Sequence, residues 1–160
     1  MEQVRQACDV ARRLCAALDD AITSAKDLSA PMARLESQPL FAAAARRTAV
    51  NVTIADLVSA LGEALRSIAA SLGWTELTME RLKLQAPADA TLLDAELADI
   101  RRRAAILQKL DETNRVRGSR ALRWMRVLVA GHTGQVVTSA YNRRGTLAPS
   151  LTLSTASRRL

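Results

Sequence analysis

Aromatic residues are scarce in this chain, and so are glycine and proline. The 160 residues include only 2 Trp, 1 Tyr, 1 Phe, 6 Gly and 4 Pro, although hydrophobic residues make up 49%. The apolar content is therefore mainly Ala, Leu, Val and Ile, which suits helices, whereas sandwiches and barrels need aromatic residues and frequent turns. The composition predicts an all-α protein with enough chain for one domain and a real core.

The sequence also shows no pattern typical of a membrane-spanning or secretory segment. The sequence has no run of about 18 apolar residues, so we expect no membrane insertion. The first residues, Met1 to Arg5, lack the charged region followed by an apolar region that marks a secretory signal. The predicted localisation is therefore cytoplasmic.

Cysteine and histidine are too few to suggest a metal or redox site. Cys8 and Cys15 are seven residues apart on a helical pattern, about 10 Å along the axis, which is too far for a disulfide within one helix. We expect both to be buried thiols in a reducing compartment. The single histidine, His132, lies far away in the sequence. The sequence therefore predicts no metal and no cofactor.

Catalytic motifs are absent as well. The chain has no phosphate-cradling Gly-rich loop, no CxxC, no HExxH and no GxSxG. One histidine limits general-base chemistry, and adjacent carboxylates such as Asp19 and Asp20 point to different faces of a helix. We expect a protein that is not an enzyme and has no catalytic residues.

The net charge of +7 is unevenly distributed. Residues 1–99 contain 10 Lys and Arg against 14 Asp and Glu, whereas residues 100–160 contain 13 against 2. This asymmetry indicates either an acidic partner for the C-terminal third or packing of that third on the acidic part. Nucleic acid is a weaker alternative, because the arginines are spread around the predicted helix and stacking aromatics are nearly missing.

Apolar periodicity predicts an antiparallel bundle of three long helices with a short connecting helix. The first helix runs from Glu2 to about Leu28, with a buried stripe, and the second from about Leu40 to Leu72, with Gly73 as its C-cap. Between Pro31 and Pro39, residues 32–38 form a short helical turn or a link. The stripe expected in the first helix consists of Val4, Ala7, Ala11, Leu14, Leu18, Ile22 and Ala25.

A short helix and then the third long helix follow. Thr78 is the expected N-cap of the short helix, which stops before Pro87, and residues 86–89 are expected to form a loop. Thr91, with Asp94 three residues later, resembles a capping box and is expected to open the third helix, which runs to about Ala130. The predicted domains are a bundle over residues 1–130 and a flexible basic tail over residues 131–160.

A heptad seam runs along the third helix and becomes polar in the middle. Apolar residues recur at alternating steps of four and three residues, which is the spacing of a helix that packs one seam against a partner. Asp111, Asn114 and Gly118 interrupt this apolar seam. Such residues can fix helix register and allow close approach, or they can mark a stretch where a partner's helix joins the bundle. The apolar positions are Leu93, Leu97, Ile100, Ala104, Leu107, Ala121, Met125 and Leu128.

The residues around this interruption resemble the C-terminal core of FlgN-type flagellar export chaperones. That family has a Leu-rich helix leading into an Asn-x-x-Asn-Gly element, then a further helical stretch and a tail with Tyr followed by Gly. Asn114 and Gly118 match this element, whereas Arg117 stands where a second Asn is usual. Tyr141 and Gly145 match the tail element. The likeness covers residues 72–145.

The resemblance implies a cytoplasmic export chaperone of the flagellar type III system. Members bind hook-associated junction proteins (FlgK or FlgL type), prevent their premature assembly and deliver them to the export-gate protein FlhA. The family likeness makes Tyr141 the expected export-gate contact. The alternative is a basic helical protein that binds nucleic acid or serves as a scaffold, and a homo-oligomer stays open. The residues expected in or near the substrate-protein site are Asn114, Gly118, Leu122, Met125 and Val129.

Overall fold

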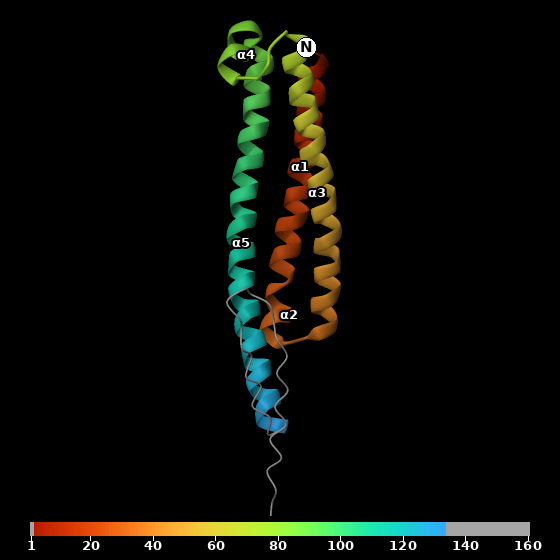
Figure 1. Cartoon of the computed structure of the whole chain (residues 1–160), viewed down its shortest axis with the longest axis vertical. Coiled ribbons are helices and arrows are strands. Elements are labelled where there is room, and N and C mark those ends of the chain that lie inside the picture. Colours follow the sequence, from red (N-terminus) through yellow and green to blue (C-terminus); the bar gives the residue numbers. More distant parts are fainter. Residues whose placement is uncertain (1, 134–160) are drawn as a thin grey trace, which may run out of the picture. The chain divides into compact units, whose positions relative to one another are not determined.

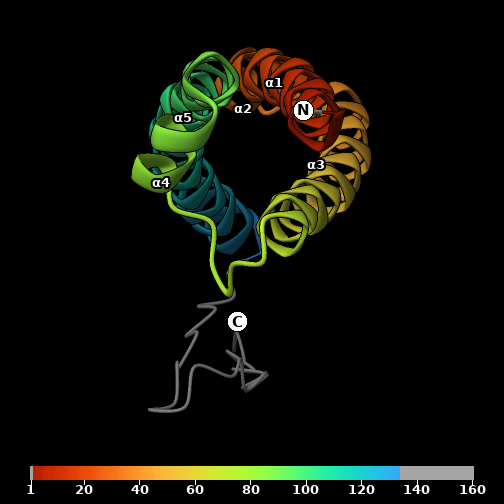
Figure 2. The same ribbon diagram turned by 90° about the horizontal axis from the view of Figure 1, so that it is seen from above.

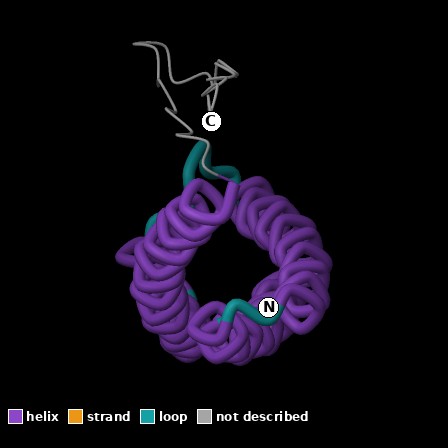
Figure 3. Tube along the Cα trace, turned by 90° about the horizontal axis from the view of Figure 1, so that it is seen from below, coloured by secondary structure: helices purple, strands orange, loops and turns teal. Residues whose placement is uncertain are grey.

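Helices dominate the part of the chain that the structure describes. The computed structural model describes residues 2–133, with side chains through residue 129, and contains no strand within that range (Figure 3). The predicted all-α class is confirmed. The helices are α1 (Glu2–Asp27), α2 (Ser29–Arg34), α3 (Ser37–Ser71), α4 (Met79–Gln85) and α5 (Pro87–Thr133).

The contacts of the chain divide it into two compact units. The first contains residues 1–115, which include α1 to α4 and the beginning of α5. The second contains residues 116–160, of which the structure describes the remainder of α5. The predicted flexible tail over residues 131–160 lies almost entirely outside the described residues, so that boundary stays a prediction.

Within the first unit, α1 lies between α3 and α5 (Figures 1 and 2). Arg12 on α1 pairs with Glu96 on α5, with 2.9 Å between Nε and Oε1. Further along both helices, Asp19 pairs with Arg103 at 3.0 Å. Residue numbers thus rise together in this pair, which means that α1 and α5 run in the same direction.

Helices α1 and α3 run in opposite directions. Val4, near the start of α1, clusters with Ile68 near the end of α3. Toward the end of α1, the guanidinium of Arg47 near the start of α3 donates a hydrogen bond to the carbonyl of Ala21. The short helix α2 lies between them in sequence and makes contacts with both.

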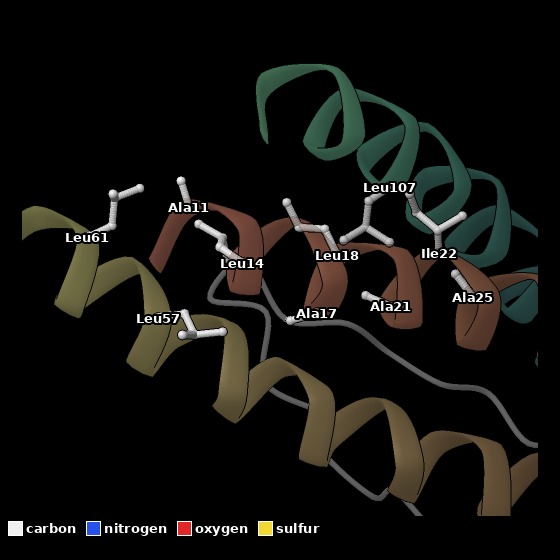
Figure 4. Packing of buried hydrophobic residues seen from close by; sticks show 10 residues of the cluster. All are labelled: Ala11, Leu14, Ala17, Leu18, Ala21, Ile22, Ala25, Leu57, Leu61 and Leu107. Carbon is white, nitrogen blue, oxygen red and sulfur yellow. The ribbon is translucent and has the colours of Figure 1, made fainter. Parts of the chain in front are cut away.

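The core forms around the apolar side of α1, as the sequence predicts. Every residue of the predicted α1 stripe is buried, and the part from Ala11 to Ala25 clusters with Leu57 and Leu61 of α3 and Leu107 of α5 (Figure 4). Val4 and Ala7 belong to a second cluster. Burial on α1 extends beyond that stripe, because the helix is covered from two sides. The additional buried residues are Cys8, Cys15, Ala17, Ala21 and Ser24.

The two cysteines are free and buried, which agrees with the expectation of unpaired thiols. Burial raises the pKa of the Cys8 thiol, and the nearby carboxylate of Glu96 raises it further. Burial also raises the pKa of Cys15. Both side chains therefore serve as small apolar packing groups that stay protonated at neutral pH.

Two helix starts differ from the sequence prediction, and proline explains both. Helix α3 begins at Ser37, not near Leu40, with Pro39 in its first turn. Helix α5 begins at Pro87, so residues 86–89 do not form the predicted loop and Thr91 does not open the helix. The hydroxyl of Thr91 instead donates a hydrogen bond of 2.8 Å to the carbonyl of Pro87. Proline fits a first turn because N–H groups there have no partner within the helix.

The predicted helix ends around the α3–α4 connection are confirmed. Gly73 has a φ of 70°, the left-handed conformation that glycine adopts most readily. Its N–H donates to the carbonyl of Ala70 at 3.0 Å, and the N–H of Trp74 donates to that of Ala69 at 2.9 Å. These two bonds define a Schellman motif that ends α3. Thr78 then precedes α4 in an extended conformation, although its side chain accepts no capping hydrogen bond from the first turn.

Helix α3 has the length and apolar composition of a membrane-spanning helix, which the sequence prediction did not anticipate. Arg47, Asp56 and Glu63 nevertheless interrupt it. The core helix of a soluble protein meets the same criteria, so this single helix is a weak indication of a membrane span.

Truncation of a buried leucine at the start of α5 should destabilise the fold. Leu93 is 0% exposed, whereas its neighbour Leu92 is 56% exposed. We expect Leu93→Ala to lower the free energy of unfolding by about 2–5 kcal/mol, because it removes buried methyl groups and leaves a cavity. Leu92→Ala is the matched control and should cost less than about 1 kcal/mol. Urea denaturation followed by circular dichroism measures both, and equal losses would contradict this packing.

Candidate partner-binding surface on helix α5

The predicted seam on α5 is partly buried inside the first unit. Leu93, Leu107 and Asn114 are buried, and Leu97 and Ile100 are half-buried. These residues follow heptad spacing and face α1 and its neighbours in the two apolar clusters. The seam prediction therefore identifies the packed face of α5 over residues 93–114, although Ala104 and Asp111 on the same seam are exposed.

Helix α5 continues without a break through the polar interruption. It extends from Pro87 to Thr133 and includes Gly118, where the sequence left open whether the helix ends. Gly118 is half-buried and takes no positive φ. The residues on either side of it therefore share one helical register.

Asn114 holds the end of α1 against α5. Its side-chain amide is buried and donates a hydrogen bond of 2.6 Å to the carbonyl of Ala25. Ala25 lies in the last turn of α1, so this bond ties the end of that helix to α5. This contact gives Asn114 the register-fixing role, one of the two alternatives that the sequence left open. The other alternative was partner binding.

Asp111 has a partner on α3 that the sequence did not reveal. One guanidinium nitrogen of Arg47 lies 2.7 Å from a carboxylate oxygen of Asp111, and another donates to the carbonyl of Ala21 at 2.6 Å. The Arg47 side chain is 13% exposed, so most of this cation is removed from water. A cation beside the last turns of α1 also interacts favourably with the partial negative charge at that helix end. Arg47 therefore links all three long helices.

A surface hollow of about 640 Å³ lies beside this polar group. No group of three or more His, Cys, Asp or Glu residues that could hold a metal ion occurs among the described residues. Nη2 of Arg115 lies 2.7 Å from Oε1 of Glu112, and this hydrogen bond lowers the pKa of the Glu112 carboxyl. The lining residues of the hollow are Leu18, Ala104, Leu107, Gln108, Asp111, Glu112 and Arg115.

The other predicted binding residues lie on the second unit. Leu122, Met125 and Val129 are exposed on α5, and Gly118 is half-buried between turns of the same helix. Leu122 and Val129 are seven residues apart, and Met125 lies between them, so the three share one face. Tyr141, the expected export-gate contact, lies outside the described residues.

Two further apolar residues belong beside this face. Leu128 is a position of the predicted seam and is 60% exposed, and Trp124 is 65% exposed. The heptad spacing identifies Leu128, but no pattern in the seam identifies Trp124. We use the term α5 apolar face for the residues that share this side of the helix: Ala121, Leu122, Met125, Leu128 and Val129.

The basic charge of α5 is partly neutralised in its first part. Arg103 pairs with Asp19 and Asp99, and Arg102 also pairs with Asp99. Such exposed pairs contribute little to stability, so they orient side chains more than they stabilise the fold. Among the described residues, no ion-pair partner is found for three exposed arginines further along: Arg120, Arg123 and Arg126.

The hydrogen bond from Asn114 should contribute measurably to stability. We expect Asn114→Ala to lower the free energy of unfolding by about 1–3 kcal/mol, because a buried carbonyl loses its donor. The control is Asn51→Ala on an exposed site of α3, which carries the same change in helix propensity. Urea denaturation of both variants measures the difference. A loss no greater than that of the control would contradict the structural role of Asn114.

Comparison with known proteins adds no relative from which a function could be transferred. No protein-family model, no curated protein and no solved structure matches this chain. The likeness to FlgN-type chaperones therefore stays a prediction that rests on the residues around Asn114 and Gly118 and on Tyr141 and Gly145.

Proposed function

We propose that this protein is a cytoplasmic flagellar export chaperone that binds hook-associated junction proteins. The observation that carries the proposal is the α5 apolar face, where large apolar side chains are exposed at helical spacing. An exposed apolar stripe on a helix is typical of surfaces that accept an amphipathic helix. Asn114 and Gly118, which match the Asn-x-x-Asn-Gly element of the FlgN family, lie on the same helix just before this face.

The fold supports this proposal through its helical architecture. We propose that the three long helices form one bundle in which α1 and α5 run alike and α3 runs opposite. Half-buried residues of α3 and α5 pack against the α1 core, including Leu65 and Ile100. Such a bundle would hold α5 as a rigid support, so that a partner helix meets a preformed surface and less ordering entropy is lost.

The partner in this proposal is the helical terminus of a junction protein. Termini that form coiled coils only after assembly expose apolar stripes beforehand, and a chaperone helix can cover such a stripe. Leu122, Met125 and Val129 would contact that stripe, and Gly118 would allow close approach of the two backbones. Asn114 is already bonded to α1, so we propose that its role is to hold α5 against α1.

A basic helical protein that binds nucleic acid is the second candidate. The exposed arginines Arg120, Arg123 and Arg126 favour it, because unpaired cations on one helix can neutralise phosphates. The two functions differ in salt dependence. Binding of a junction protein through an apolar face should be largely insensitive to moderate salt, whereas affinity for nucleic acid falls steeply with salt.

Acidic substitutions on the α5 apolar face should weaken substrate binding. We expect Leu122→Asp combined with Met125→Asp to weaken binding to the purified C-terminal helix of a junction protein by at least about tenfold, because charges would be buried at an apolar contact. The control is Val116→Asp with Val127→Asp, two exposed valines on the opposite side of α5. Isothermal titration calorimetry measures both. Equal weakening by the two pairs, or binding by neither the parent nor the variants, would contradict the proposal.

Tyr141 should act at a later step than substrate binding. We expect Tyr141→Ala to weaken binding to the cytoplasmic part of FlhA by about tenfold, the loss typical of truncating an aromatic anchor. Affinity for the junction protein should stay unchanged. Asn142→Ala is the neighbouring control, and surface plasmon resonance with each partner in turn measures the two affinities. An equal effect on both partners would argue against a separate gate contact.

A further inference from the structure

The second unit presents a stretch of helix on which successive large apolar residues are exposed. Between Val116 and Val129, exposed fractions reach 54% for Leu122, 65% for Trp124 and 60% for Leu128. In the first unit, by contrast, the leucines on the seam of α5 are buried or half-buried. Contiguous exposed apolar side chains of this size mark a surface that another molecule covers.

Helical geometry gathers these residues on one side. At about 100° per residue, the α5 apolar face covers an arc of about 120° around the helix axis. Trp124 falls at the edge of this arc, next to Leu128. Indole rings favour such an edge position, because one end of the ring is apolar and the N–H prefers water.

Four arginines occupy the remaining side of the same stretch, together with the exposed valines Val116 and Val127. Arg126 lies beyond one edge of the apolar face, Arg117 lies at the other, and Arg120 and Arg123 lie between them on the far side. Glu112 is the last acidic residue of the sequence, so residues 116–129 carry four positive charges and no negative one. The stretch is therefore a basic amphipathic helix with a tryptophan at its polar–apolar boundary.

We propose that residues 116–129 of α5 bind the surface of a membrane that contains anionic lipids. The apolar face would enter the boundary between headgroups and acyl chains, while the arginines would contact the phosphate and other anionic headgroup oxygens. A lipid surface fits this stretch better than a protein helix does. The negative charge of a lipid surface extends continuously to both sides of the apolar face, so no register between two helices has to match. Each arginine near such a surface strengthens binding by about fivefold.

This inference does not depend on the proposed chaperone function, although both use Leu122 and Met125. A bound partner helix and a membrane would cover the same apolar face and could not do so together. The test therefore uses the full chain alone, without any junction protein, so its result is independent of that binding.

The experiment measures co-sedimentation with vesicles of phosphatidylcholine alone and of equal phosphatidylcholine and phosphatidylglycerol. We expect the chain to bind the anionic vesicles and to remain in solution with the neutral ones. In a Trp74→Phe background, Trp124 is the only indole, and its fluorescence should shift to shorter wavelength with anionic vesicles. Free phosphatidylglycerol headgroup, added as glycerol phosphate, should cause neither effect, because it offers no apolar phase.

Charge-matched variants test which arginines contribute to binding of the anionic vesicles. Arg120→Gln, Arg123→Gln and Arg126→Gln together should weaken binding to anionic vesicles by at least about tenfold. The control replaces three exposed arginines of the first unit, Arg5, Arg13 and Arg66, and removes the same net charge. Circular dichroism checks that both variants remain helical.

Three results would overturn the proposal. The first is equal binding to neutral and anionic vesicles, or binding to neither. The second is an equal loss in the two triple variants, which would indicate attraction by net charge alone. The third is vesicle binding without a shift of Trp124 fluorescence, which would place the contact elsewhere on the chain. Binding to an acidic amphipathic peptide in the absence of any vesicle binding would instead favour a protein partner.

Discussion

Burial of α1 from two sides is the constraint on which the rest of residues 1–115 depends. Alanine, leucine and cysteine make up most of its buried surface, and they spread over more of the helix than one neighbour can cover. Small residues allow close helix approach, and the larger side chains of Leu57, Leu61 and Leu107 fill the space around them. Helix α3 covers one side of α1 and α5 covers the other, so each outer helix needs only a narrow apolar seam.

The polar interruption in α5 follows from where α1 ends. A helix terminus leaves carbonyl groups without helical donors, and a buried terminus must find donors elsewhere. Asn114 donates to the carbonyl of Ala25 in the last turn of α1, and Arg47 donates to the carbonyl of Ala21 and pairs with Asp111. An apolar residue at position 114 would remove the side-chain donor to Ala25, and one at position 111 would remove the carboxylate partner of Arg47, which explains why the heptad pattern becomes polar at this level.

Local chemistry determines how much of this could be predicted from the sequence. The α1 stripe and the Gly73 cap follow from spacing and from one residue's conformational preference, and both are confirmed. The starts at Ser37 and Pro87 were missed because proline was interpreted as a breaker, although it is equally suited to a first turn. The contact between Arg47 and Asp111 joins residues 64 apart, and no local pattern encodes such a pair. Trp124 was missed because it lies at the edge of the seam and not on it.

The same heptad pattern has two different consequences along α5. Up to Asn114 the seam is matched by α1, and several arginines there meet carboxylates from α1 or from α5 itself. Beyond Gly118 the apolar steps continue, but the acidic residues of the sequence have ended at Glu112. This part of α5 keeps an apolar stripe but has no acidic residues nearby in sequence. It therefore cannot be covered and neutralised in the same way as the first part of the helix. The occupant proposed for this face would supply an apolar surface and negative charge together, as an acidic amphipathic helix or an anionic lipid surface does.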